Sequence, residues 1–427
     1  MSGMSNNSPP ISRQIRRWRK NLLLFLSIMG PGIITASADN DAGGIATYAT
    51  AGASYGYELL WMLFLMTFSL GVVQEMNARM GAVTGKGLSD LIREQFGVKM
   101  TLLAMFVLLI ANTATTIAEF AGIAASMEIF GVSKYISVPV AAAVIWSLVV
   151  KGSYKKVEQV FLGLCLIFIT YVISGFLVHP PWGEIARQTF TPSFRFESHY
   201  LLVFIGTIGT TITPWMQFFI QSSVVDKGVT LKDYKYTRAD VLFGAFVTSF
   251  IAFFIIVATA ATLHKAGIQI TTVKDAAVAL NPLAGKMASY LFAIGLFGAS
   301  MLAGTVLPLS TAYAICEAFG MESGVSKRFE EAPVFFWLYT AVIVIGAGFI
   351  LIPKVSLILV MLISQDVNGI LLPVILIFML KLINNKKLMG SYTNGPIFNT
   401  IAWGTAIALI VLTALLLITS INPGLLA

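Results

Sequence analysis

Long apolar runs recur along this chain, and each is long enough to cross a lipid bilayer as one helix. Only 11% of the 427 residues are charged, whereas 57% are hydrophobic. So few charged side chains cannot cover the surface of a water-soluble fold of this length, and the composition therefore excludes a soluble enzyme. We predict an all-α membrane protein with eleven transmembrane helices, over residues 21–54, 58–80, 100–128, 135–150, 157–178, 200–225, 240–263, 285–319, 333–352, 355–383 and 397–420.

Basic residues are distributed unequally between alternate loops of this arrangement. Counted over the eleven helices, 21 of the 28 Lys and Arg residues fall on the side that holds the N-terminus. Because basic loops remain in the cytoplasm, we expect a plasma-membrane protein with residues 1–20 as a cytoplasmic tail and the C-terminus outside. The net charge of +8 then describes topology, so we expect no nucleic-acid partner; no obligate protein partner is evident either.

Two of the expected helices contain residues that interrupt a helix. The first holds Gly30–Gly32 and Asp39–Gly44, and the sixth holds Gly206 and Gly209–Pro214 near its middle. Gly tolerates non-helical dihedrals and Pro removes a backbone donor, so both segments should unwind and expose carbonyl oxygens. Gly and Pro are common in membrane helices in general, but two breaks at matching positions indicate a site.

The matching positions predict an inverted-repeat transporter. If helices 1–5 and 6–10 form two halves, each half begins with a broken helix, and the substrate binds at mid-membrane between the breaks, as in LeuT-like transporters. We therefore predict one transporter domain over residues 21–420, with two inverted five-helix repeats (21–178 and 200–383) and an extra helix (397–420).

Asp41 lies in the first break, at membrane depth. An ionised carboxylate there costs about 2.5–3.5 kcal/mol, and a bound cation is the simplest compensation. Asp41 can also cap the half-helix that follows, and the two roles are compatible. Asp39 faces a different direction in any regular backbone, and the sequence leaves open whether it belongs to the site or to a vestibule.

Further polar residues lie inside the apolar runs. Glu119 and Asp366 are intramembrane acids, and Gln365 and Asn368 beside Asp366 offer oxygen donors. The two amides could equally form hydrogen bonds between helices. Four other acids fall close enough to span ends to be interfacial: Glu58, Glu75, Glu128 and Glu317.

Residues 30–35 (Gly-Pro-Gly-Ile-Ile-Thr), 41–44 (Asp-Ala-Gly-Gly) and 213–216 (Thr-Pro-Trp-Met) resemble motifs of the Nramp family of divalent-metal transporters. In that family a Gly-Pro pair leads into Asp-Pro-Gly-Asn, and Met-Pro-His lies in helix 6. Ala118-Glu119 and Ser364-Gln365 resemble it too, and the resemblance runs from helix 1 to helix 11. It implies a divalent metal ion as the substrate and no cofactor.

Carried over residue by residue, the resemblance places the metal-binding aspartate on Asp41 and a main-chain carbonyl ligand on Thr210. Three family residues are replaced: the asparagine corresponds to Gly44, the methionine to Thr213 and the helix 6 histidine to Trp215. This pattern is similar to the Nramp-related magnesium transporters.

The chemistry of the replacements agrees with that branch. A thioether favours transition metals, whereas Thr213 offers hard oxygen. The resulting oxygen-lined site suits Mg²⁺, which keeps several waters, and Gln365, Asp366 and Asn368 could hold them. Mn²⁺ accepts the same ligands. The helix 3 aspartate that the family links to proton movement falls on Thr116, and helix 9 lacks the family's arginines, so we expect alternating-access uptake of Mg²⁺ and Mn²⁺ without proton coupling.

Three alternatives compete with this interpretation. A cation-coupled amino-acid transporter of the same architecture would present bare helix ends to a carboxylate, which Asp41 would repel. An intramembrane hydrolase using Asp39 and Asp41 would need the two acids to flank a scissile bond, and their spacing is poor for that. A signalling protein that no longer transports would need an output domain, and the sequence offers none.

Overall fold

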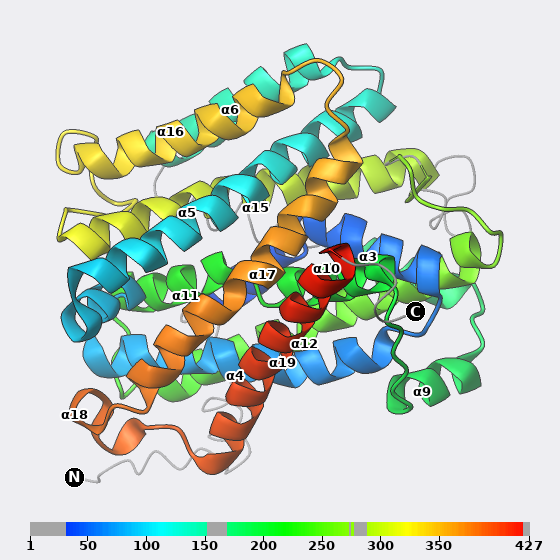
Figure 1. Cartoon of the computed structure of the whole chain (residues 1–427). Helices are drawn as coiled ribbons and strands as arrows, with labels where there is room; N and C mark the ends of the chain where they lie inside the picture. Colours follow the sequence, from blue (N-terminus) through cyan, green and yellow to red (C-terminus); the bar gives the residue numbers. More distant parts are fainter. Residues whose placement is uncertain (1–30, 152–168, 273–274, 277–287, 422–427) are drawn as a thin grey trace, which may run out of the picture.

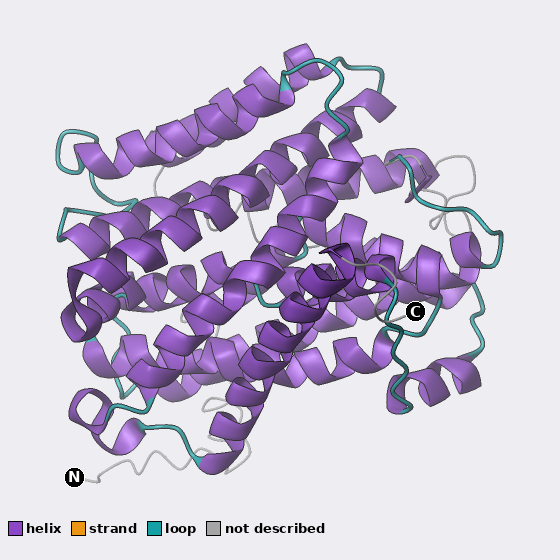
Figure 2. Cartoon of the chain, in the orientation of Figure 1, coloured by secondary structure: helices purple, strands orange, loops and turns teal. Residues whose placement is uncertain are grey.

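The computed structural model describes residues 31–151, 169–272, 275–276 and 288–421. Within these ranges the chain consists of helices, turns and loops without any strand (Figure 2). The predicted all-α fold is therefore confirmed.

Eight helical segments of the described chain are long and apolar enough to cross a membrane. They are α4 (Leu60–Thr84), α5 (Leu88–Ile129), the interrupted pair α10 (Ser198–Thr211) and α11 (Pro214–Asp226), α12 (Tyr234–Thr259) with its π-helical end η2 (Ala260–His264), α15 (Ala288–Phe319), α16 (Pro333–Ile350), α17 (Leu357–Ile383) and α19 (Pro396–Ile421). Shorter helices are α2 (Pro31–Asp39), α3 (Ala42–Tyr55), α6 (Lys134–Val150), α8 (Ile169–Leu177), α9 (Trp182–Phe190), α18 (Lys386–Met389) and η5 (Gly390–Tyr392).

The observed helices depart from the expected ranges in a few places. α5 begins at Leu88 rather than near residue 100, because a charged first segment continues through a kink at Gly97 (φ 75°, ψ 178°) into the apolar part. α12 likewise begins at Tyr234 and carries several polar residues before its apolar run. The short α9 was not expected, and residues 157–168 of the fifth expected helix lie outside the described residues.

Apolar side chains cover the outside of the bundle as well as its core. On α6, Ile136, Val140 and Val144 are spaced four residues apart and are 50–62% exposed. Residues at this spacing share one face of a helix, so α6 presents a continuous apolar stripe outward. Such a stripe is favourable against lipid and unfavourable against water.

The broken helices occupy the interior of the bundle. α3 and α10 lie near its centre, α17 and α19 cross in front of them, and α6 and α16 run side by side at one edge (Figure 1). α5 packs extensively against both α15 and α17. The segments predicted to unwind are thus surrounded by protein rather than lipid, as irregular backbone at membrane depth requires.

Glycines allow two of these packing contacts to be unusually close. α10 meets α17 where a Cβ built on Gly209 would overlap the carbonyl oxygen of Gln365 and the backbone nitrogen of Gly369. α2 meets α12 where a Cβ on Gly244 would lie 2.6 Å from the carbonyl oxygen of Gly32. Small residues of this kind let helix backbones approach in membranes.

Replacing Gly209 with alanine is expected to destabilise the protein by about 1–3 kcal/mol, because α10 and α17 must separate to admit the methyl group. Thermal unfolding in detergent measures the effect. Gly404→Ala on α19 is the matched control, because a Cβ there meets no atom within 4 Å. Equal melting temperatures for the two variants would contradict the close contact.

Candidate metal centre

The first helix is interrupted between α2 and α3, at Asn40 and Asp41. Asp41 has an extended backbone (φ −74°, ψ 179°) and is the N-cap of α3: its Oδ1 accepts a hydrogen bond from the Gly44 amide at 2.5 Å. Gln365 Nε2 donates to the same oxygen at 3.4 Å. The other oxygen, Oδ2, is buried and has no hydrogen-bond partner among the described residues. Asp41 therefore both caps α3 and keeps one carboxylate oxygen available.

The second break lies between α10 and α11, at Ile212 and Thr213. Ile212 (φ −129°, ψ 74°) and Thr213 (φ −75°, ψ 147°) leave the helical region, and Pro214 starts α11. Proline is well suited to the first helical position because its missing N–H would be unsatisfied there in any case. The hydroxyls of Thr210 and Thr213 are buried without a partner among the described residues.

α10 approaches the first break at Gly44, through Thr210 in its last turn. A Cβ built on this residue would lie 2.8 Å from Thr210 Oγ1 and 3.1 Å from Asp41 Oδ1. The position that the resemblance assigned to the family's asparagine is thus beside both Asp41 and Thr210. A larger residue there requires the Thr210 side chain to move.

α17 supplies the amide side of the centre. Gln365 lies directly against the first break, since a Cβ on Gly43 would overlap its Nε2. Asn368 Nδ2 donates to Gln365 Oε1 and to Thr115 Oγ1, each at 3.0 Å. Asn368 thereby holds the Gln365 side chain that contacts Asp41.

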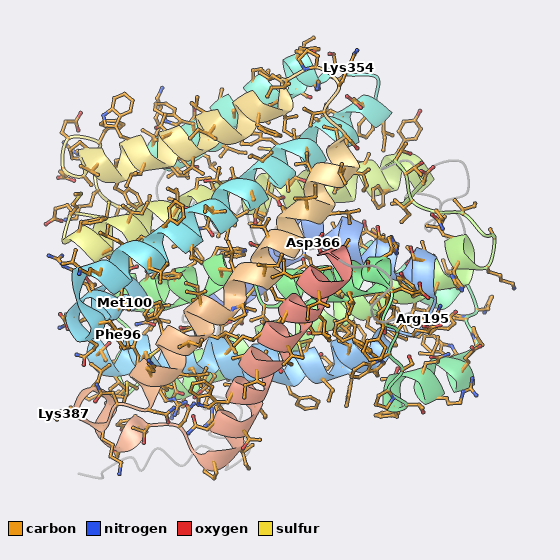
Figure 3. All side chains as sticks on the ribbon, in the orientation of Figure 1. Phe96, Met100, Arg195, Lys354, Asp366 and Lys387 are labelled. Atoms are coloured by element: carbon orange, nitrogen blue, oxygen red, sulfur yellow. The ribbon has the colours of Figure 1, made fainter. Side chains whose placement is uncertain are left out.

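Asp366 is turned to a different side of α17. Its Oδ1 lies 2.8 Å from the position of a Cβ on Gly206 of α10. Figure 3 shows Asp366 partway along α17, between Lys354 and Lys387 near the two ends. The structure therefore groups Asp41, Gly44, Thr210 and Gln365, with Asn368 behind Gln365, and places Asp366 apart from them.

Two further acids bond to backbone amides of the broken first helix. Glu119 Oε2 accepts from the Ala42 amide at 3.2 Å, at the start of α3. Asp240 Oδ2 accepts from the Gly32 amide at 2.8 Å, at the start of α2. Sequence reasoning noted Glu119 but gave it no partner, and it missed Asp240, whose only signal is an acid at the beginning of an apolar run.

The remaining candidates have structural surroundings. Asp39 faces α12, where Thr248 Oγ1 donates to its Oδ2 at 3.3 Å. Trp215 is fully buried, and its carbonyl accepts a hydrogen bond from Ser310 Oγ at 2.9 Å. Thr116 Oγ1 donates to the Asn112 carbonyl at 2.7 Å. Glu75, expected at an interface, is only 2% exposed: it pairs with Arg79 one helical turn away at 3.1 Å, which the sequence could have suggested.

The grouped residues therefore supply one carboxylate, that of Asp41, together with neutral hydroxyl and amide oxygens, and the Glu119 carboxylate lies beside them at the Ala42 amide. No group of three or more His, Cys, Asp or Glu side chains suited to a metal occurs in the part of the chain that the structure describes. Hard cations such as Mg²⁺ bind through one or two carboxylates and keep several waters, whereas soft metals prefer thiolate and imidazole. The donor set fits a hydrated hard divalent cation.

Two interrupted helices that meet at a buried carboxylate define a secondary transporter of the broken-helix class. The chain belongs to the Nramp family: the family model described as natural resistance-associated macrophage protein-like matches residues 32–419. This membership confirms the family that the motifs resemble.

Relatives and solved structures agree with that assignment. The divalent metal cation transporter MntH of Vibrio campbellii is 29% identical over 381 residues, covering 86% of each chain. MntH of Bacillus subtilis is 25% identical over 406 residues, covering 92% of each. A manganese transporter structure from Eremococcus coleocola, in complex with an aromatic bis-isothiourea compound, matches with a TM-score of 0.77 at 20% identity, covering 92% of this chain and 86% of that one.

The fold extends beyond the family. Mhp1, a nucleobase-cation-symport-1 family transporter in a closed conformation, matches with a TM-score of 0.57 at 14% identity, covering 93% of this chain and 88% of that one. The prediction of a LeuT-like transporter rather than an enzyme is thus confirmed by the family and its structural neighbours.

Replacing Asp41 with alanine is expected to leave a folded, monodisperse protein that no longer binds divalent metal, because the only carboxylate of the grouped residues is removed. Metal-induced thermal stabilisation in detergent measures this. Glu184→Ala, an exposed acid on α9, is the control and should keep the wild-type shift. A wild-type stabilisation in well-folded Asp41→Ala would remove Asp41 from the site.

Proposed function

We propose that this protein carries Mg²⁺ and Mn²⁺ into the cell by alternating access, without coupling to protons. The observation that carries the proposal is the unpartnered Oδ2 of Asp41, buried beside neutral oxygens. The names of the MntH relatives support a divalent metal cation as the substrate class.

The proposal that Mg²⁺ is a substrate beside Mn²⁺ rests on the residues that replace the family's methionine and asparagine. Thr213 stands where the family has a methionine thioether, and Gly44 stands where it has an asparagine amide. The nearby Met216 does not replace the thioether, because its sulfur accepts a hydrogen bond from Gln74 of α4 at 3.2 Å. A site deprived of two direct ligands leaves room for the waters that Mg²⁺ retains.

Gln365 and Asn368 are proposed to orient those waters. Their amide groups form a chain that ends on Asp41, so each can pass a hydrogen bond to a water bound by the cation. Asp366, which lies against Gly206, would join the hydrated cation only after α10 and α17 move relative to one another.

Alternating access is supported by the burial of the centre. Asp41, Thr210, Thr213, Gln365 and Asn368 are all 0% exposed. A cation reaches such a site only when helices separate on one side, and opening of the two sides in turn would let it cross.

We also propose how the helices are arranged across the membrane. The eight long spans, with the α2–α3 pair, α6 and α8, make up the eleven helices, arranged as two inverted repeats and an extra helix. The plasma membrane, a cytoplasmic N-terminus and an outer C-terminus follow from the unequal distribution of Lys and Arg.

Mg²⁺ and Mn²⁺ are expected to compete for one pathway, while Ca²⁺ is carried poorly because it prefers six to eight oxygen ligands. Uptake of each ion into vesicles containing the purified protein tests the function. Protein-free vesicles and Asp41→Ala vesicles are the controls. Absence of Mg²⁺ and Mn²⁺ uptake above both controls would refute the proposed function.

The double substitution Thr213→Met and Gly44→Asn is expected to raise Cd²⁺ uptake relative to Mg²⁺, because the thioether is a soft ligand and the carboxamide takes the place of a water that Mg²⁺ would retain. The introduced asparagine side chain must displace Thr210 Oγ1, which lies 2.8 Å from the added Cβ. Gly44→Ala is therefore the steric control. An unchanged ratio of Cd²⁺ to Mg²⁺ uptake would show that other residues set selectivity.

Proton coupling needs groups that bind and release H⁺ across the membrane, and the described residues offer few. Trp215 and Thr116 replace the ionisable residues of the family, and α16 contains no arginine. His264 Nδ1 bonds to the Ala53 carbonyl at the end of α12, away from the centre. Glu119 Oε2 accepts a hydrogen bond from the Ala42 amide, and its Oε1, which has no partner among the described residues, is the main candidate for a proton site.

Metal uptake is therefore expected to leave the internal pH of vesicles unchanged. The membrane potential alone supplies about 4.6 kcal/mol for a divalent cation per 100 mV, so no proton gradient is required. A pH-sensitive dye inside the vesicles during Mn²⁺ uptake is the measurement. Metal-dependent acidification above the protein-free control would refute uniport, and Glu119→Gln would then be the first variant to examine.

A further inference from the structure

Four buried carboxamide side chains lie between α4 and α11, on the side of the second break away from α10. We call them the carboxamide track: Gln74 and Asn77 on α4, and Gln217 and Gln221 on α11. All four are 0% exposed. None of them belongs to the candidate metal centre.

The track begins at the second break. Thr213, Gln217 and Gln221 are spaced four residues apart, so they share one face of α11. Gln217 Nε2 donates to the Thr213 carbonyl at 3.0 Å, and Asn77 Nδ2 donates to Gln217 Oε1 at 2.6 Å. Eight residues of helix separate Thr213 from Gln221, which corresponds to about 12 Å. The track therefore leads from the second break toward the far end of α11.

α4 presents a corresponding row of residues to this face of α11. Gln74, Asn77 and Gly81 are spaced three and four residues apart and face α11. Gly81 brings the backbones together, since a Cβ there would lie 3.2 Å from the Gln221 carbonyl oxygen. The two stripes thus run alongside one another for their whole length.

The hydrogen bonds of the track are one-sided. All four amide nitrogens donate to protein atoms, including Gln74 Nε2 to a methionine sulfur and Gln221 Nε2 to the Lys86 carbonyl at 2.8 Å. In contrast, Gln74 Oε1, Asn77 Oδ1 and Gln221 Oε1 have no partner among the described residues, and neither does Thr213 Oγ1. Asn40 and Asn112 elsewhere in the bundle each have one such unpartnered oxygen, whereas the track places three of them and the Thr213 hydroxyl along two adjacent helices. Here the unused atoms are oxygens, the ligands that hard divalent cations prefer.

Arg79 lies close to the track in sequence, and its guanidinium group bonds to residues outside the track. Arg79 on α4 pairs with Glu75 at 3.1 Å, and its Nη1 donates to the carbonyls of Tyr392 and Thr393 at 3.1 and 3.2 Å. The track is accordingly lined by neutral oxygens, which bind a cation more weakly than a carboxylate does. A permeating ion needs such a site, because it must be released again.

We propose that the carboxamide track is a second, weaker binding site for the transported divalent cation, occupied after the cation leaves Asp41 and before it leaves the protein beyond α11. This inference rests on the proposed function. In addition to the function proposed above, the residues of the track would affect the rate of cation release without changing the affinity of the Asp41 site.

Gln217→Leu tests the proposal by removing the amide at the middle of the track. We expect the maximal Mn²⁺ uptake rate in vesicles to fall about five-fold or more, while the Mn²⁺ Kd from calorimetry in detergent changes less than about two-fold. Asn384→Leu is the matched control: Asn384 belongs to a satisfied carboxamide pair with Asn399, at 2.8 and 2.9 Å, between α17 and α19. It should transport at the wild-type rate.

Gln217→Glu provides a second readout that does not depend on transport. A carboxylate on the track should retain the cation, so electron paramagnetic resonance titration should count one tightly bound Mn²⁺ in the wild type and two in this variant. Gln221→Leu repeats the Mn²⁺ uptake measurement at the far end of the track. One folded leucine variant is then enough to test the proposal.

Wild-type uptake by a folded Gln217→Leu or Gln221→Leu variant would overturn the transit site and leave the proposed function intact. A Kd that weakens in proportion to the rate would also overturn it, because Gln217 would then belong to the Asp41 site. Wild-type vesicles that take up neither Mg²⁺ nor Mn²⁺ would instead refute the proposed function itself.

Discussion

A helix interrupted inside a membrane exposes backbone N–H groups that no surrounding water can satisfy, and the architecture of this protein depends on how those groups are bonded. The amides of Gly44 and Ala42 donate to Asp41 and Glu119 at the start of α3. Neither acid forms an ion pair with a Lys or Arg of the described chain. The positive end of the α3 dipole stabilises the two carboxylates instead of a basic side chain, which explains how they are tolerated at membrane depth. The second oxygen of Asp41, Oδ2, has no hydrogen-bond partner among the described residues.

Close helix contacts keep these bonds in place. Gly209 and Gly369 bring α10 within backbone contact of α17, and the same stretch of α17 carries Gln365 to Asp41. Any side chain at the crossing would move Gln365 away from the carboxylate. The packing glycines and the polar centre are therefore parts of one arrangement, in which helix separation sets the positions of the ligands.

The features that local sequence determines were predictable, and those that depend on distant contacts were not. Gly, Pro and Asp predicted both breaks, because they change backbone preferences where they stand. Asp240 was missed because its partner is 208 residues away. Asp366 was grouped with Gln365, although neighbouring residues of a helix do not face the same side. The assignment of Thr210 came from family resemblance, since a main-chain ligand leaves no mark in the sequence.

The pairing of α2 with α12 has a consequence for motion. Gly32 bonds to Asp240 and Asn40 bonds to Thr248, so both ends of α2 meet residues 208 positions later, and the two helices run parallel in register. Swinging α2 out by itself would break both bonds. Under the proposed alternating access we therefore expect α2 and α12 to move together, with the sliding surfaces on the outer sides of this pair.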